Sequence, residues 1–184
     1  REALKQGGVA LDVGANKGSY LYWLAKWSRG AQVVGFEPQK KLADYLVLAM
    51  RQAAMGHAIV EHMALSDQTG DVTLYIPGSS DSPGASLERS VSDKTACHEE
   101  RVRMTTLDSY AAAHLKGSVR ALKIDVEGHE WAVLKGAGNA QAGHLVRCLG
   151  NQILAQVCDA AGRRRVDAAD QVEHRSLART VGAN

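Results

Sequence analysis

Residues 9–18 read VALDVGANKG, and this sequence is the strongest indication of the fold class. It opens with a short apolar run, Val9–Val13, that ends at a glycine-containing turn. An uninterrupted apolar run of this length is typical of a strand buried on both faces of a sheet. Residues 20–27 follow, with apolar side chains at helical spacing. A strand, a tight turn and a helix in this order predict the first unit of an α/β domain.

The same alternation continues along the chain. Residues 32–36 and 58–63 are predicted strands, and the segment between them has one apolar helical face, formed by Leu42, Leu46, Ala49 and Ala53. A further strand is predicted at residues 121–125. Strands that alternate with helices imply right-handed crossovers and a doubly wound, mostly parallel sheet. Such sheets bind ligands at the carboxyl ends of their strands, so the residues that follow each strand matter most.

Residues 66–105 interrupt this alternation and predict a β-hairpin and loop insertion. A turn at 66–71 leads into residues 72–76, where apolar and polar side chains alternate as in a half-buried strand. Residues 77–94 are rich in Ser, Gly and Pro and predict a mobile loop, after which 101–105 alternate again. The insertion is placed to cover a site at the edge of the sheet, although an ordinary surface loop has the same signature.

The C-terminal residues 138–184 contain no Phe, Trp, Tyr, Lys or Pro. Because aromatic side chains supply much of the buried area of a core, this segment is expected to pack poorly. Its apolar positions Ile153 and Leu154 fit one helix, and no strand is expected after Ala137. The predicted organisation is a domain over residues 1–137, followed by an atypical or incomplete C-terminal part that is helical or disordered.

Composition and charge exclude several classes of protein. The 184 residues include 22 Lys and Arg against 20 Asp and Glu, and a formal net charge of +2 argues against a dedicated nucleic-acid binder. The three cysteines lack the spacing of a disulfide framework or a zinc site. No apolar run reaches the length of a membrane span, and the first residues do not form a signal peptide. A cytoplasmic protein without nucleic-acid or membrane partners is expected, and its oligomeric state stays open.

The glycine turn has the spacing D-x-G-x-x-x-G, beginning at Asp12, and not the G-x-G-x-x-G of dinucleotide-binding proteins. A carboxylate at the end of the strand would repel a pyrophosphate but attract an ammonium group, while the amides of the turn would hold a carboxylate. S-adenosylmethionine offers both groups. Glu37 ends the second strand about 20 residues later, where an acidic residue commonly accepts the hydroxyls of a ribose. The alternative is that Asp12 and Glu37 are helix caps.

Two further strand ends carry candidate residues. Ala64 and Leu65 follow the third strand, where they would pack either on an adenine ring or in the core. The fourth strand leads into Asp125, Glu127 and His129. Asp125 could orient a substrate hydroxyl, take its proton or hold a divalent cation. The alternative is that Asp125 or Glu127 caps the next helix and that His129 is a solvated surface residue.

Six segments, taken together and in this order, resemble the FkbM-type methyltransferases: LDVGANKGSY, VVGFEPQ, ALSDQTGDVTLYIPG, GASLERS, TTLDSY and LKIDVEGHEWAVLKGA. The resemblance covers residues 9–137 and implies a Rossmann-like, class I, S-adenosylmethionine-dependent enzyme. It also implies that the cofactor is surrounded by Asp12, Gly14, Ala15, Asn16, Gly18, Glu37, Pro38, Ala64, Leu65 and Asp125.

The reaction implied by this resemblance is O-methylation of a small-molecule acceptor, a hydroxyl of a sugar, a polyketide or another metabolite. Asp125, Glu127 and His129 are the candidate catalytic residues, and no metal is expected. The atypical C-terminal part leaves open a non-catalytic or truncated remnant of such an enzyme. A second alternative is an NAD(P)-dependent oxidoreductase on a similar sheet, against which the glycine spacing and Asp12 both count.

Overall fold

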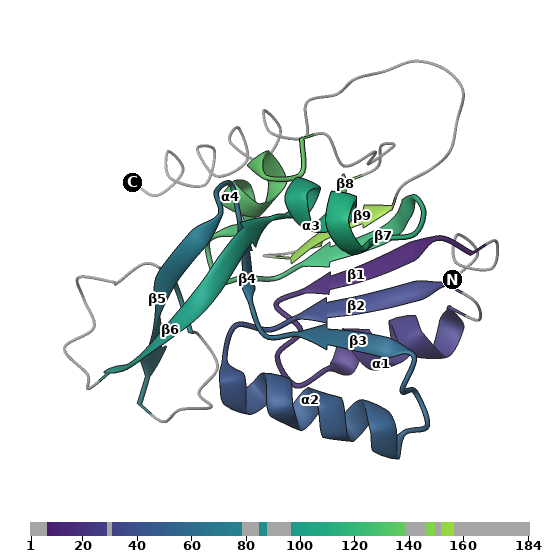
Figure 1. The fold of residues 1–184 in the computed structure, drawn as a ribbon, viewed down its shortest axis with the longest axis horizontal. Coiled ribbons are helices and arrows are strands. Elements are labelled where there is room, and N and C mark those ends of the chain that lie inside the picture. Colours follow the sequence, from purple (N-terminus) through teal and green to yellow (C-terminus); the bar gives the residue numbers. More distant parts are fainter. Residues whose placement is uncertain are drawn as a thin grey trace, which may run out of the picture.

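The computed structural model describes residues 7–28, 31–78, 85–87, 97–138, 146–149 and 152–156. Its main sheet has the strand order β3-β2-β1-β7-β9-β8 (Figure 1). The first four strands in this order are parallel to one another, whereas β9 pairs antiparallel with β7. Their bounds are Ala58–Glu61 for β3, Gln32–Phe36 for β2, Val9–Val13 for β1, Val119–Ile124 for β7, Gln152–Gln156 for β9 and Val146–Leu149 for β8.

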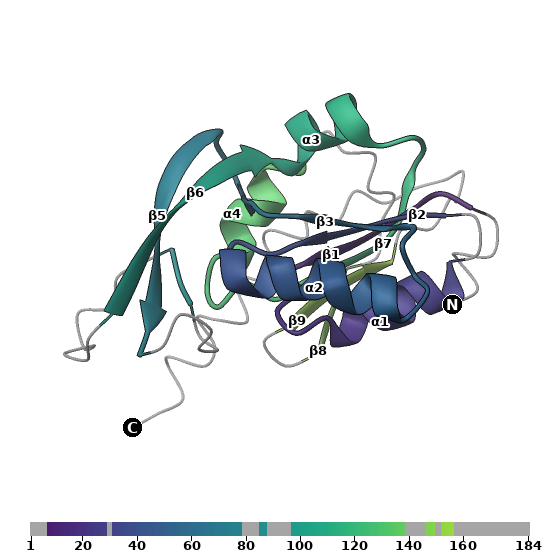
Figure 2. The ribbon, with the colours of Figure 1, turned by 60° about the horizontal axis from the view of Figure 1, so that its bottom comes forward.

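Helices cover both faces of this sheet. The helices α1 (Ser19–Trp27) and α2 (Lys40–Gln52) lie on one face, and α3 (Leu107–His114) lies on the other (Figure 2). The short helix α4 (Glu130–Lys135) packs through Val133 into the same core as α3. All five residues of β1 are buried, which explains why that strand reads as a continuous apolar run. The expected α/β fold with a doubly wound, mostly parallel sheet is confirmed.

A second, smaller sheet has the order β4-β6-β5 and lies beyond the carboxyl ends of β1, β2 and β3 (Figure 1). Its strands are β4 (Ala64–Ser66), β5 (Gly70–Pro77) and β6 (Cys97–Thr106), and β5 and β6 form the hairpin that the alternating pattern predicts. Of the expected loop beyond β5, Ser86 pairs with Tyr75, while residues 79–84 and 88–96 lie outside the described residues.

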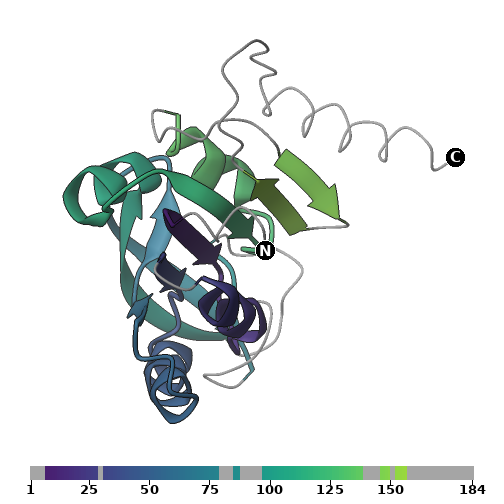
Figure 3. The same cartoon turned by 90° about the vertical axis from the view of Figure 1, so that its right-hand side faces the viewer.

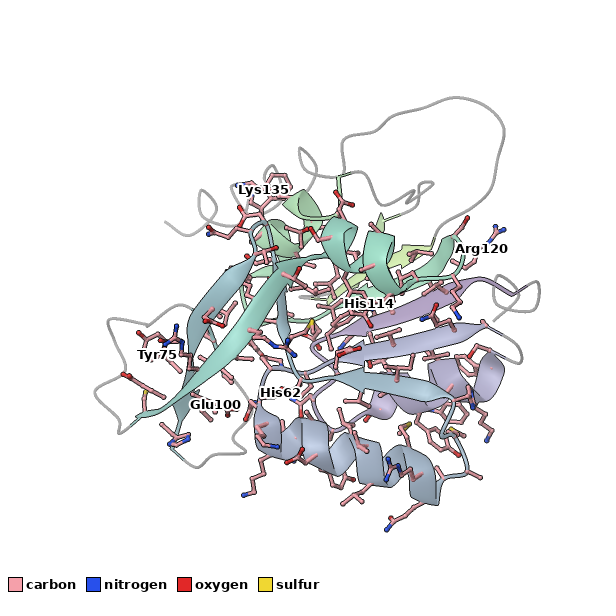
Figure 4. All side chains as sticks on the ribbon, in the orientation of Figure 1. His62, Tyr75, Glu100, His114, Arg120 and Lys135 are labelled. Atoms are coloured by element: carbon pink, nitrogen blue, oxygen red, sulfur yellow. The ribbon has the colours of Figure 1, made fainter. Side chains whose placement is uncertain are left out.

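Glu100 links the second sheet to the first. This residue belongs to β6, and its Oε1 accepts hydrogen bonds from the backbone N–H of Lys40, at 3.0 Å, and from Nε2 of His62, at 3.2 Å. Figure 4 shows the side chains of Glu100 and His62 beside each other near the start of α2. His62 Nε2 is also 2.9 Å from the carbonyl oxygen of Pro38. Glu100 therefore links the hairpin to the first turn of α2 directly, and to the loop after β2 through His62.

The helix α3 was not predicted from the sequence, although its N-cap is recognisable. The hydroxyl of Thr106 accepts a hydrogen bond from the backbone N–H of Ser109, as an N-cap threonine does. Tyr110 packs edge-on against Phe36 with 4.8 Å between ring centroids, and its hydroxyl donates to Glu61 at 2.9 Å. Burial and the neighbouring carboxylate raise the pKa of Tyr110, so its hydroxyl stays a donor.

The C-terminal part departs from the expectation of a helix or disorder. Residues 146–149 and 152–156 form β8 and β9 at the margin of the main sheet (Figure 3). Ile153 and Leu154 belong to β9, in register with Ile124 and Lys123 of β7, so the expectations of a helix there and of no strand after Ala137 are wrong. The unpaired edge of β7 is a template for another strand, and this long-range pairing overrides the local pattern.

The segment 157–184, over which the helical or disordered tail was also expected, lies outside the described residues. Within the residues that the structure describes, no helix is long and apolar enough to cross a membrane.

Gly136 permits α4 to dock on β4, and its replacement tests this packing. A Cβ atom at this position would overlap the backbone carbonyl of Ser66. We expect Gly136→Ala to lower the free energy of unfolding by roughly 1–3 kcal/mol, the usual effect of overpacking. Gly56→Ala is the matched control, because a Cβ there meets no atom within 4 Å. Urea unfolding followed by circular dichroism measures both, and equal losses in the two variants would contradict the assignment.

Candidate functional site

A cavity of about 330 Å³ opens where the carboxyl ends of β1, β2 and β7 face the second sheet. Its size and position are those expected for a ligand site of an open α/β sheet. The lining combines polar groups from the main sheet with apolar side chains from the hairpin region, among them Leu74, Ala85 and Leu87. The predicted residues that line it are Gly14, Ala15, Asn16, Glu37, Pro38, Ala64, Leu65, Asp125, Glu127 and His129.

Gly14 lets two loops of the site approach each other. Its φ is +72°, and a Cβ atom there would overlap the backbone carbonyl of Asp125. The backbone N–H of Asp125 donates to the carbonyl of Val13 at 3.0 Å, so the ladder between β1 and β7 continues into these loops. The glycine requirement at this position therefore comes from contact between the two loops.

The amides of the turn are largely used within the protein. Those of Gly14 and Ala15 both donate to the carbonyl of Phe36 at 3.0 Å, and that of Gly18 donates to Ala15 at 2.8 Å. The amide of Asn16 donates to Oε2 of Glu37 at 2.7 Å. These four amides are therefore engaged within the protein in this structure, and the expected contact of the turn with a ligand carboxylate stays a prediction.

Asp12 does not line the cavity. Its side chain is fully buried, and Oδ1 lies 3.0 Å from Nζ of Lys123. The parallel register pairs Asp12 of β1 with Lys123 of β7, which places both side chains on the same side of the sheet. The predicted direct contact of Asp12 with a ligand ammonium is therefore replaced by an ion pair inside the protein.

Lys123 is the site residue that the sequence analysis missed. Only 4% of its side chain is exposed, yet the residue contributes to the lining of the cavity. Its Nζ donates to the carbonyl of Gly14 at 2.7 Å and lies 3.7 Å from Oδ2 of Asp125. Burial raises the pKa of Asp12 and the neighbouring ammonium of Lys123 opposes that rise. The sequence did contain a signal for this role. Lys123 lies inside a strand predicted to be buried, and a buried ammonium requires an anionic partner nearby.

Glu37 is held rigidly at the edge of the cavity. It is 3% exposed, and its two carboxylate oxygens accept from the amides of Asn16, at 2.7 Å, and Gln39, at 2.9 Å. Burial raises its pKa, and these two hydrogen bonds oppose the rise. A carboxylate has about four lone-pair sites, so two further acceptor positions remain for a ligand.

The loop after β7 brings Asp125, Glu127 and His129 to the cavity. Glu127 has a φ of +50°, an uncommon conformation for a residue other than glycine. The carboxylate of Glu130 accepts from the amides of Val126, at 3.2 Å, and Gly128, at 3.3 Å, and so closes the turn around Glu127. His129 precedes α4, and its Nε2 lies 2.9 Å from the hydroxyl of Ser66. The three candidate catalytic residues therefore come from one loop and all belong to the cavity lining.

Gly18 is the other predicted residue outside the cavity lining. It precedes α1 with a φ of +83°, and a Cβ atom there would press on Leu46 of α2. In this structure the absence of a side chain at Gly18 allows the start of α1 to pack against α2.

Residues 12–170 match the family model of the methyltransferase FkbM domain. The chain belongs to the FkbM methyltransferase family. The crystal structure of methyltransferase FkbM from Methylobacillus flagellatus KT superposes with a TM-score of 0.51 at 19% sequence identity. This alignment covers 75% of the present chain and 31% of the Methylobacillus protein, so the chain spans about a third of that protein's length.

At that identity, the Methylobacillus structure supports the fold alone. No curated protein matches the chain. The FkbM family match extends to residue 170 and therefore includes β8 and β9 beyond residue 137, the boundary expected from composition.

The buried ion pair can be tested by removing its charges. We expect Lys123→Met to lower the free energy of unfolding by roughly 3–5 kcal/mol, because Asp12 stays buried without its partner. The double variant Asp12→Leu, Lys123→Met should recover most of this loss. Lys116→Met, at an exposed position, is the matched control and should change stability by less than about 0.5 kcal/mol. A single Lys123→Met variant as stable as this control in urea would contradict the structural role.

Proposed function

We propose that this FkbM domain binds S-adenosylmethionine in the cavity and O-methylates a hydroxyl group of a sugar, a polyketide or another small metabolite. The observation that carries the proposal is the buried carboxylate of Glu37, fixed by two amides at the end of β2 and open to the cavity. An acidic residue at this point of an α/β sheet is suited to the two hydroxyls of a ribose. Family membership supports the same reaction class.

The remaining walls match the two ends of this ligand. Met63, Ala64 and Leu65 are apolar and lie where the chain passes from β3 into the second sheet, next to Glu37 in the lining, which suits an adenine ring. At the opposite end, the ammonium of Lys123 lies between Asp12 and Asp125. Two carboxylates facing one ammonium favour a further cation, such as the amino group or the sulfonium of the ligand.

The chain's own residues chiefly position the reactants in this proposal. S-adenosylmethionine, when bound, supplies an electrophilic methyl group. Asp125, Glu127 and His129 lie on the wall where an acceptor hydroxyl would be oriented and deprotonated. Leu74, Ala85 and Leu87 cover the cavity from the hairpin region and would exclude water from the acceptor.

Binding of the cofactor is the direct test. We expect isothermal titration calorimetry to detect S-adenosylmethionine binding, and Glu37→Gln to weaken it by roughly 10–100-fold, the value of a hydrogen bond to a charged group. Glu99→Gln, an exposed position on β6, is the control and should keep the wild-type affinity. Circular dichroism checks that each variant is folded. The same affinity in Glu37→Gln as in wild type would remove the main support, and a folded wild type without affinity would favour a non-catalytic remnant.

The acceptor is identified by a separate experiment. We expect mass spectrometry to detect a mass gain of one methyl group when the domain and cofactor are incubated with a panel of monosaccharides and hydroxylated aromatic compounds. Matched deoxy compounds lacking the hydroxyl are the controls. Methylation of these controls to the same extent would contradict transfer to oxygen.

A further inference from the structure

Three polar side chains, Ser66 and Asp67 at the end of β4 and His129 before α4, form a hydrogen-bonded chain that reaches the cavity through His129. The hydroxyl of Ser66, the last residue of β4, lies 2.9 Å from Nε2 of His129 and 3.2 Å from Oδ1 of Asp67. Ser66 is 1% exposed, so the chain is anchored in the protein interior. The docking of Gly136 against the carbonyl of Ser66 holds α4, and with it His129, next to β4.

The number of protons available permits one consistent arrangement of these bonds. The carboxylate of Asp67 only accepts, and the hydroxyl of Ser66 has a single proton. If that proton were given to His129, the oxygen atoms of Ser66 and Asp67 would face each other without a proton between them. Ser66 therefore donates to Asp67, and Nε2–H of His129 donates to Ser66.

The neutral imidazole is then fixed in its Nε2–H tautomer, which leaves the lone pair on Nδ1. We propose that Nδ1 of His129 is the proton acceptor for the substrate hydroxyl, and that Ser66 and Asp67 are positioning residues that set its tautomer. This inference rests on the methyl transfer proposed above. His129 belongs to the cavity lining, whereas Ser66 and Asp67 do not.

The charges around Asp125 and His129 indicate different roles for these two residues. The carboxylate of Asp125 lies 3.7 Å from the ammonium of Lys123 and belongs to the charged cluster under the glycine turn. Among the described residues, the side-chain hydrogen bond of His129 goes to a neutral hydroxyl, that of Ser66, and an imidazole is the side chain best suited to accept a proton near neutral pH. Asp125 therefore serves the cationic end of the cofactor, and His129 serves the acceptor.

The acceptor oxygen forms a bond to the methyl carbon while the bond between that carbon and the sulfonium sulfur breaks, and sulfur keeps the electron pair. The hydroxyl proton passes to Nδ1 of His129, and the resulting imidazolium releases it to water after the products leave. Ser66 and Asp67 keep their protonation states throughout.

The tautomer is measurable without any substrate. Long-range proton–nitrogen NMR spectra of the full chain, recorded where the imidazole is neutral, distinguish Nε2–H from Nδ1–H, and the signals of His129 are assigned by their loss in His129→Gln. We expect wild type to show Nε2–H. A wild-type spectrum dominated by Nδ1–H overturns the proposal.

Two substitutions of the exposed Asp67 give a matched comparison. Asp67→Asn keeps a carbonyl oxygen that accepts from Ser66, so the Nε2–H tautomer should persist. Asp67→Ala frees the hydroxyl proton of Ser66 to donate to Nε2, and the Nδ1–H form should rise to a population comparable with Nε2–H. Ser66→Ala should also mix the tautomers, provided that circular dichroism shows it folded. Unchanged tautomers in both Asp67→Ala and Ser66→Ala overturn the positioning role.

Measurements of kcat test whether the tautomer matters for catalysis. They also distinguish failure of this inference from failure of the proposed function. With the acceptor panel, His129→Gln should lower kcat by about 100-fold or more, the usual contribution of a general base, with S-adenosylmethionine affinity unchanged. Asp67→Ala should lower kcat in proportion to the lost Nε2–H population, while Asp67→Asn should keep the wild-type kcat.

Undiminished kcat in His129→Gln overturns the inference but leaves the methyltransferase proposal standing. A wild type that binds no cofactor refutes the proposed function, and with it the role of His129 as the base, although the tautomer is still decided by NMR.

Discussion

A buried ammonium between two carboxylates is the constraint on which the site depends. Lys123 is almost completely removed from water, and its charge is tolerable only because Asp12 lies 3.0 Å away on the neighbouring strand. The same ammonium holds the carbonyl of Gly14 and approaches Asp125. The register of β1 and β7 thereby determines where the glycine turn and the acidic loop stand relative to each other.

Much of the fold could be predicted because its signals are local. The apolar run of β1, the helical face of α2 and the alternation in β5 each specify their element and the face that it buries. The strand β9 could not be predicted in this way. Ile153 and Leu154 fit a helix equally well, and it is the open edge of β7, distant in sequence, that makes them a strand.

The site shows the same division between local and long-range information. Glu37 and Asp125 were predicted as cavity residues because each directly follows a strand, and the carboxyl ends of parallel strands meet at one edge. Asp12 lies in the first strand as predicted, but its ion-pair partner Lys123 comes from β7, and only the pairing of the two strands reveals which charges meet. The contact between Ser66 and His129 depends on how closely α4 approaches β4, which no spacing in the sequence specifies.

The hydrogen bonds of Glu100 couple two walls of the cavity. Glu100 of β6 accepts from the backbone N–H of Lys40, and His62 joins Glu100 to the carbonyl of Pro38, a residue of the cavity lining. A replacement of the β5–β6 hairpin that lacked an acidic side chain at this position would therefore alter the wall formed by the loop after β2 as well as the wall formed by Leu74. The shape of the cavity on these two sides thus depends on a single carboxylate.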